Sequence, residues 1–254
     1  MKLLETEAII LRTYKLSEAD KIFLAFTLRY GMMRGVAKGA RRLKSRFGAS
    51  LEPFTLTQLS CFEKEGSELV SLRQSEIVNS YFGLASCDRM FLTLEYLAEL
   101  IIEFVPPRAP DEKLFRMVKA CLEALISTPV HVDAVTRYFE IWMLKLSGFL
   151  PDLRKCTSCG QLLTERGVVV SNVPGTGFRC GICTNVGEER TVTRQTLRLL
   201  VDALRLPPAN WVAKADIESS ESLEELRLFL KTLISRVLER EPRVKPGLRI
   251  VASA

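Results

Sequence analysis

The segment Tyr30–Phe54, YGMMRGVAKGARRLKSRFGASLEPF, decides how the first third of the chain is interpreted. No acidic residue lies between Asp20 and Glu52, and the basic residues in that interval are Lys21, Arg29, Arg34, Lys38, Arg41, Arg42, Lys44 and Arg46. Repeated glycines exclude one long helix, because glycine favours turns and lets another backbone come close. Such a segment suits contact with the phosphates of a polyanion; a solvated loop whose charges only keep the protein soluble is the alternative.

Short runs of β-branched, aromatic and aliphatic residues predict five strands around this segment. They are Glu7–Tyr14, Lys21–Arg29, Met32–Lys38, Phe54–Phe62 and Leu69–Val78, separated by polar or glycine-containing turns. Five strands in so short a stretch predict a small antiparallel sheet closed into a barrel, for which the OB-fold is the commonest solution.

The residues of the second run alternate between two faces of the predicted sheet. The set that we interpret as the core face is Ile22, Leu24, Phe26 and Leu28. On the opposite face Phe23 lies between Lys21 and Arg29, which suits a base stacked on the ring while its phosphates meet the two cations. The alternative is that Phe23 packs beneath a loop or another domain.

Other side chains extend this basic surface. Arg34 and Lys38 share a face of the third run, so the surface continues onto the loop Gly39–Ser50. Tyr14 shares a face with Arg12 and is a weaker candidate for stacking. Residues 1–80 hold 13 Lys and Arg against 9 Asp and Glu, so 4 of the 6 net positive charges fall in this part of the chain and locate an anionic partner there.

The composition describes a soluble, intracellular chain. Of the 254 residues 47% are hydrophobic, which is enough for more than one packed core. Glu5 and Glu7 interrupt the apolar run of a signal peptide, and the most apolar helix, Met90–Val105, carries glutamates at helical spacing. We therefore expect a cytoplasmic protein without a membrane segment, whose seven cysteines stay reduced.

Beyond Tyr81 the apolar period changes from two to about three and a half, which predicts helices. The first three cover Met90–Val105, residues 111–128 and Asp133–Ser147. Thr193 is a suitable N-cap for a further helix that ends at Pro207-Pro208, and Ser222 with Glu225 predicts a capping box for the last one. These helices predict a bundle rather than a βαβ repeat.

Two cysteine pairs, Cys156 with Cys159 and Cys180 with Cys183, form the pattern C-x₂-C-x₂₀-C-x₂-C. Four thiolates complete a tetrahedral zinc site and leave no open position for water or substrate, so we expect one structural Zn²⁺. The segment between the pairs predicts a hairpin. Thiol–disulfide chemistry is the competing interpretation, but a redox C-x-x-C normally opens a helix in a βαβ setting, which the sequence lacks.

No group of residues indicates catalysis. The single histidine, His131, is expected to be structural, and no phosphate-binding glycine loop follows a strand. Cys61, Cys87 and Cys121 lie in apolar surroundings and are expected to be buried. We therefore predict that the protein is not an enzyme.

Three parts of the chain together resemble the RecO family of bacterial recombination-mediator and DNA-repair proteins. They are the start AIILRTYKLSEADKIFLAFTLRYG, the segment VAKGARRLKSRFGASLEPFTLTQL, and the helical region with its two C-x₂-C pairs. The resemblance covers essentially the whole chain. It implies an α+β multidomain protein with an OB-fold in residues 1–80 and a helical domain in 81–254, into which a zinc module is inserted at about 151–190.

The resemblance also implies a function. RecO-like proteins bind single- and double-stranded DNA without sequence specificity, anneal complementary strands and contact single-stranded-DNA-binding protein (SSB). With RecR they help load RecA onto SSB-coated gaps in the RecF pathway, at the nucleoid during repair. By this analogy the basic positions Arg34, Lys38, Arg41, Arg42, Lys44 and Arg46 are the DNA contacts, to which the strand residues above add Lys21, Phe23 and Arg29.

Two other functions stay open. One is a nucleic-acid-modifying enzyme that uses the zinc module as a substrate clamp, but it needs a catalytic dyad or a nucleotide-binding loop. The other is a zinc-stabilised adaptor that binds only proteins, which would show no affinity for nucleic acid at physiological salt.

Overall fold

The computed structural model describes residues 1–163, 168–170, 177–183, 191–217 and 220–246. The chain divides into two compact units, Met1–Leu122 with the chain from Val244, and Glu123–Arg243. The first unit holds the strands of the N-terminal region, and the second holds the four cysteines of the predicted zinc module.

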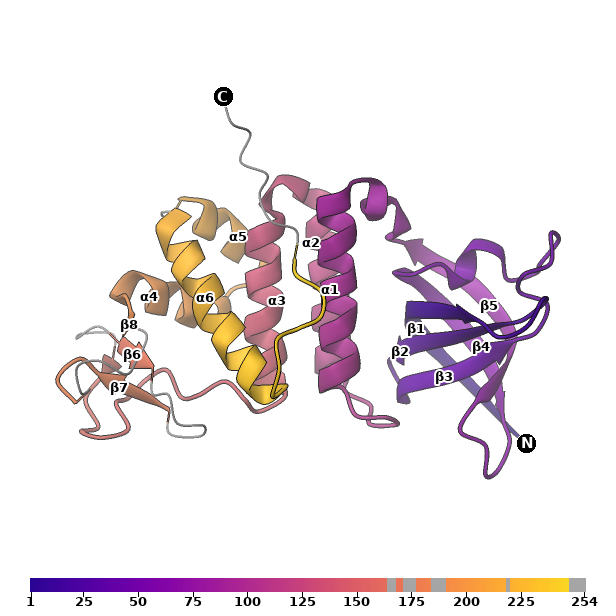
Figure 1. The fold of residues 1–254 in the computed structure, drawn as a ribbon, viewed down its shortest axis with the longest axis horizontal. Coiled ribbons are helices and arrows are strands. Elements are labelled where there is room, and N and C mark those ends of the chain that lie inside the picture. Colours follow the sequence, from indigo (N-terminus) through magenta and orange to yellow (C-terminus); the bar gives the residue numbers. More distant parts are fainter. Residues whose placement is uncertain (164–167, 171–176, 184–190, 218–219, 247–254) are drawn as a thin grey trace. The chain divides into compact units, whose positions relative to one another are not determined.

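The first unit is built on a closed five-stranded barrel with the strand order β1-β2-β3-β5-β4 (Figure 1). The strands are β1 Lys2–Lys15, β2 Lys21–Thr27, β3 Gly31–Ala37, β4 Thr55–Glu63 and β5 Val70–Ser80. β1 pairs with β4 through its first half and with β2 through its second half, and this double pairing closes the ring. The predicted OB-like barrel is confirmed, although β1 begins at Lys2 rather than at Glu7.

The barrel interior is filled by apolar side chains from every strand and from the connection between β3 and β4. They are Leu4, Ala8, Ile10, Phe23, Ala25, Met33, Ala37, Phe47, Leu51, Leu59, Cys61, Val70 and Leu72. The ring of Phe23 lies against the backbone of Gly35, where an added Cβ would come within 2.4 Å of Phe23 Cζ. Only glycine fits at that point of close approach.

The faces of β2 are the reverse of those predicted. Phe23 and Ala25 point into the barrel, whereas Phe26 packs outside it against Phe115 of α2 (Glu112–Ser127), with ring centroids 5.5 Å apart. Because a helix covers part of the outer face, both faces of β2 are apolar. Alternation alone then identifies two faces but does not say which one is inside.

Helix α1 (Asp88–Phe104) and the part of α2 up to Leu122 also belong to the first unit. α1 forms an ion pair between Glu95 Oε2 and Arg12 Nη2 at 3.4 Å, and α2 forms one between Lys119 Nζ and Glu7 Oε1 at 3.7 Å. The chain near its C-terminus returns to this unit, since the backbone N–H of Val244 donates to Glu99 Oε2 at 2.8 Å.

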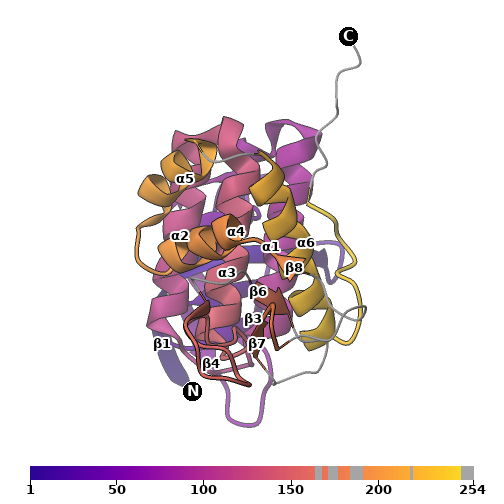
Figure 2. The ribbon, with the colours of Figure 1, turned by 90° about the vertical axis from the view of Figure 1, so that its left-hand side faces the viewer.

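The second unit is a helical bundle around α3 (Val132–Leu146). The predicted helices are present, but α1 and most of α2 belong to the first unit. α3 contacts α4 (Arg194–Ala203), α5 (Pro208–Ile217) and α6 (Ser220–Val237) (Figures 1 and 2). Trp142 Nε1 donates to the carbonyl of Ala203 at 2.9 Å, which joins α3 to the end of α4. Among the described helices of the chain, none has both the length and the apolar character that crossing a bilayer requires.

Three sequence-based expectations about the helical parts need correction. Pro207-Pro208 was interpreted only as the end of the helix that Thr193 caps. Pro208 also begins α5, where no hydrogen bond is lost because the first N–H groups of a helix have no partner within the helix. Thr193 caps α4 as predicted, yet Glu225 accepts from the Thr193 backbone N–H at 3.0 Å and does not cap its own helix, which begins at Ser220. Cys87 precedes α1 in an exposed position, whereas Cys61 and Cys121 are buried as expected.

Replacing Gly35 by Ala should destabilise the first unit, because the new methyl group would collide with the Phe23 ring. Overpacking of this kind costs about 1–3 kcal/mol, which urea unfolding can measure. Gly83→Ala is the matched control, since a Cβ there meets nothing within 4 Å. Equal stability of the two variants would contradict the packing described for Phe23.

Candidate nucleic-acid interface and metal centre

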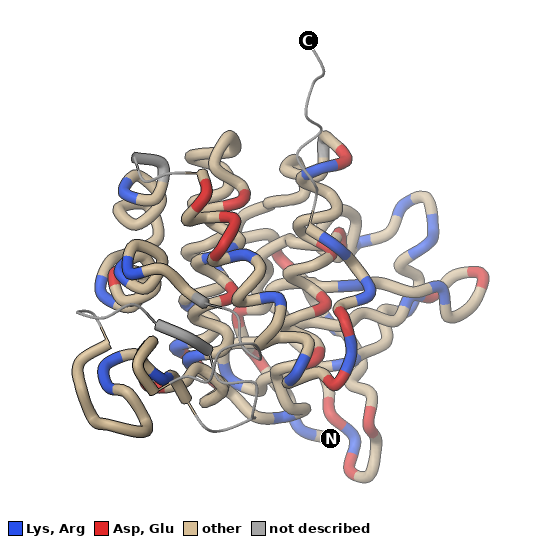
Figure 3. The backbone as a smooth tube through the Cα atoms, turned by 60° about the vertical axis from the view of Figure 1, so that its left-hand side comes forward, with Lys and Arg blue, Asp and Glu red and all other residues tan. Residues whose placement is uncertain are grey.

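Most of the predicted DNA contacts lie on one loop between β3 and the short helix η1 (Gly48–Leu51). We call residues Lys38–Phe47 the basic loop. Its exposed cationic side chains are Lys38, Arg41, Arg42, Lys44 and Arg46. Within the part of the chain that the structure describes, none of these cations forms an ion pair with a carboxylate. Figure 3 shows Lys and Arg positions crowding a loop at the right-hand edge of the molecule.

The basic loop is fixed to the turn between β1 and β2. The backbone N–H of Gly39 donates to Asp20 Oδ1 at 2.8 Å, and that of Arg41 donates to the Ala19 carbonyl at 3.0 Å. Arg41 Nη1 also donates to the carbonyl of Ser17 at 2.9 Å. Sequence reasoning missed the anchoring role of Asp20, although an acid that closes a polar turn before a strand was the available signal.

The far end of the basic loop is held by the core. Phe47 is buried in the barrel, and the guanidinium carbon of Arg46 lies 4.9 Å from the centroid of its ring. A cation over an aromatic face is attracted by the ring quadrupole. With both ends held, the remaining cations point into solvent from a fixed backbone, which raises the local positive potential.

The strand residues fall into separate groups. Arg34 is exposed on the outer face of β3, the strand that leads directly into the basic loop, and so continues the surface of that loop. Lys21 lies within 3.8 Å of Glu52, which offsets its charge. Arg29 is exposed in the turn that follows β2. The basic loop begins at the other end of this strand, directly after Ala37, which pairs with Lys21, so Arg29 lies apart from the loop.

Phe23 is not accessible for stacking on a base. Its side chain is 0% exposed and belongs to the barrel core, against the backbone of Gly35. This corrects the prediction that Phe23 belongs to the binding face. The alternative, that the ring packs beneath a loop or another domain, also did not place it inside the barrel. The physical cause is the reversed face assignment of β2.

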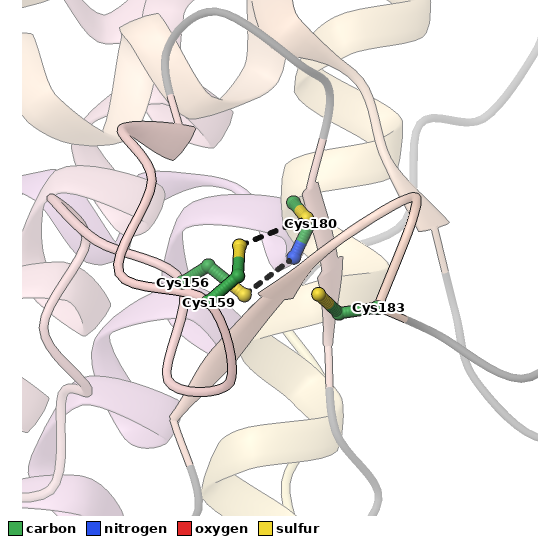
Figure 4. Close-up of side chains that lie close together, drawn as sticks. All are labelled: Cys156, Cys159, Cys180 and Cys183. Atoms are coloured by element: carbon green, nitrogen blue, oxygen red, sulfur yellow. Dashed lines mark hydrogen bonds between the residues drawn. The ribbon is translucent and has the colours of Figure 1, made fainter.

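The four cysteines of the two C-x₂-C pairs come together in the second unit (Figure 4). Their sulfur atoms all lie within 4.8 Å of one another, and Cys159 Sγ is 3.7 Å from Cys180 Sγ. Sulfurs bound at 2.3 Å to one tetrahedral zinc ion are about 3.8 Å apart. The donor set and its spacing therefore fit a single metal ion such as zinc.

Backbone turns present these sulfurs. The Gly160 N–H donates to the Cys156 carbonyl at 2.9 Å, and the Cys183 N–H donates to the Cys180 carbonyl at the same distance. Gly160 has φ of +71°, a left-handed conformation that favours glycine. Burial raises the pKa of the Cys156 thiol, but the backbone N–H groups of Cys159 and Cys180 favour its thiolate, so that the pKa falls to about 6.

The cysteine module is attached to the helical bundle through a small sheet. β6 (Val168–Val170) pairs antiparallel with β7 (Phe178–Cys180) and with β8 (Thr191–Val192), which confirms the strands of the predicted hairpin; its turn, 171–176, lies outside the described residues. The Phe178 ring packs against Phe229 of α6 with centroids 5.6 Å apart. The Thr157 N–H donates to the Phe178 carbonyl at 2.8 Å and joins the two cysteine pairs.

Comparison with known proteins covers both units. Residues 1–81 match the family model "Recombination protein O N terminal", and residues 90–246 match "Recombination protein O C terminal". The chain is 32% identical over 241 residues to the DNA repair protein RecO of Koribacter versatilis (strain Ellin345), covering 93% of this chain and 94% of that protein.

Other relatives carry the same description. The DNA repair protein RecO of Dehalococcoides mccartyi is 30% identical over 246 residues, covering 94% of this chain and 92% of that protein. That of Geobacter metallireducens is 40% identical over 161 residues, covering 63% and 64%. RecO proteins are recombination mediators rather than enzymes, as we expected from the sequence. The chain therefore belongs to the RecO family and is a DNA repair and recombination protein.

Proposed function

We propose that the protein binds single- and double-stranded DNA through the phosphate backbone, anneals complementary strands and, with RecR, helps load RecA onto SSB-coated gaps. The observation that carries the DNA part is the basic loop, whose exposed cations have no carboxylate partner among the described residues. Phosphate contacts of this kind are independent of sequence.

Annealing follows from the same charge. Two DNA strands repel each other, and each carries condensed counterions that are released when Lys and Arg side chains neutralise phosphates. A loop that binds either strand weakly lowers the repulsion between them without covalent chemistry. The roles of RecR, SSB and RecA are supported by family membership. A chromosomal substrate is consistent with action in the cytoplasm, at the nucleoid.

The metal is assigned a separate, structural role. One Zn²⁺ held by Cys156, Cys159, Cys180 and Cys183 would cross-link two turns and the β6–β7 pair. Four protein sulfurs leave no coordination site for a substrate. The ion therefore stabilises its own module, and the basic loop belongs to the other compact unit.

The DNA-binding proposal is tested by removing charges that support no other contact. Lys38, Arg42 and Lys44 form no ion pair with a described residue, so their triple Ala variant should keep the loop intact. Its affinity for single-stranded DNA should fall, and the slope of log K against log salt should decrease in magnitude by about 2, at about 0.7 for each lost phosphate contact.

The matched control removes the same charge elsewhere. The control carries Ala at Lys113 and Arg198, which are exposed on α2 and α4, and at Arg205, which is exposed in the turn after α4; it should retain the slope of the unaltered protein. If both triple variants lose the same affinity, net charge rather than the basic loop governs binding. If the unaltered protein binds no DNA at physiological salt, the DNA-binding proposal is wrong and the alternative of a zinc-stabilised adaptor that binds only proteins is favoured.

Strand annealing is a second, independent test. Complementary labelled strands should anneal faster with the protein than without it, and the Lys38, Arg42 and Lys44 variant should lose most of this acceleration. Addition of SSB to the strands tests the mediator role, because annealing that stops on SSB-coated strands would contradict it. A turnover assay on DNA and RNA substrates should show no product, since an enzyme is not expected.

Metal removal tests the structural role. Chelation or Cys183→Ser should make residues 150–190 sensitive to protease, because thiolate sites fold their own surroundings. DNA affinity should change little. Cys87→Ser is the control, since Cys87 is exposed and outside the quartet. One zinc per chain is the expected metal content, and equal protease resistance with and without the metal would show that the ion is incidental.

A further inference from the structure

The outer face of β1, β2 and β3 carries an exposed aromatic ring beside the basic surface. Two rows of side chains cross this face. One row consists of Arg12, Leu24 and Arg34, and the next consists of Tyr14, Ile22 and Val36. Tyr14 therefore lies on the same face of the sheet as Arg34, in the neighbouring row.

A β-bulge in β1 turns Tyr14 to this face. Ile10 points into the barrel and pairs with Ala25, but the next paired residue is Arg12, opposite Leu24, so Leu11 is the extra residue. Without the bulge, strict alternation would direct Tyr14 inward together with Ile10. Bulges redirect side chains in this way and are over-represented next to functional sites.

The outer face is covered at one end and open at the other. Phe26 is buried under Phe115 of α2, and Met32 bridges to Pro107. At the open end Tyr14 is 46% exposed, and no hydrogen bond joins its hydroxyl to a residue that the structure describes. The neighbouring Ile22 and Val36 are half-buried and form an apolar surface beside the ring.

The open end is also where the basic loop is attached. The loop is bound to the turn after β1, where Arg41 Nη1 donates to the carbonyls of Ser17 and Glu18 at 2.9 and 3.2 Å. Lys38, the first residue of the basic loop, comes directly after the end of β3. The charge of Arg12 is offset by Glu95. On this face and on the loop attached to it, the cations without a carboxylate partner among the described residues are thus Arg34 and those of the basic loop.

We propose that Tyr14 stacks on an unpaired base while the basic loop and Arg34 hold the flanking phosphates. This inference rests on the proposed DNA binding and adds a preference for single strands. Every base has a π-face that an aromatic side chain can cover, whatever its sequence. In a duplex both faces of each base are already stacked, so the ring finds no free face there. The cations alone would bind both forms.

The test compares three ligands of equal length: a single strand, the same strand without bases, and a duplex. Tyr14→Ala should weaken binding to the single strand by about tenfold, within the range found for one base stacked on an aromatic side chain. Its binding to the abasic strand and to the duplex should stay unchanged, because these contacts are to phosphates. Phe82→Ala is the matched control, since Phe82 is 48% exposed in the same unit but lies outside the β1–β3 face.

A second variant covers the case in which loss of the ring disturbs the barrel. Tyr14→Trp keeps an aromatic ring and adds a fluorophore, so it should bind the single strand at least as tightly as the unaltered protein. The single strand should quench the new indole, and the abasic strand should not. Loss of affinity for all three ligands in Tyr14→Ala, or quenching by the abasic strand, would overturn the stacking role.

The outcomes separate this inference from the function on which it rests. If the unaltered protein binds none of the three ligands, the proposed DNA binding fails and the stacking role fails with it. If the unaltered protein binds all three and Tyr14→Ala binds them equally well, only the stacking role is wrong. A selective loss on the base-containing single strand supports both.

Discussion

The hydrogen-bonded pairing of β1 with two other strands closes the barrel and determines where every other side chain of the N-terminal region can lie. This strand pairs with β4 at one end and with β2 at the other, so the sheet has no free edge there. A ring of five strands encloses only enough space for side chains, and the enclosed set is apolar. The cations of the N-terminal region are therefore directed to the outer face and to the loops.

The outer surface is divided between packing and binding. Helices cover the part of the barrel that carries Phe26, while the part next to the β1–β2 turn remains open. There Asp20 and the carbonyl of Ala19 accept hydrogen bonds from backbone N–H groups of the basic loop, and Arg41 also donates from its guanidinium. Lys38, Arg42 and Lys44 are left without a carboxylate partner among the described residues. An acidic residue at the base of the loop thus positions the cations without neutralising them by an ion pair.

Local sequence patterns predicted correctly the features that depend on residues close together in the chain. The five strands follow from alternation and turns, and the cysteine cluster follows from spacing, since two residues between thiols allow one turn to present both sulfurs. The predictions were wrong where the position of a side chain depends on an element that is distant in the sequence. Phe23 was assigned to the wrong face because α2 makes the outside of β2 apolar, and Glu225 was assigned to its own helix although it accepts from Thr193.

A small barrel, helices and a cluster of four cysteines could be predicted from the order of the amino acids alone, as could the concentration of positive charge between Lys21 and Arg46. These properties depend on composition and on neighbours a few residues away. The inward face of each strand, the outward direction of Tyr14 after the bulge at Leu11, and the separation of Arg29 from the basic loop became clear only from the folded chain. The direction of a side chain depends on which elements pack together. A helix on the outer face, or a bulge in the strand, can exchange the inner and outer faces while the alternating sequence pattern stays the same.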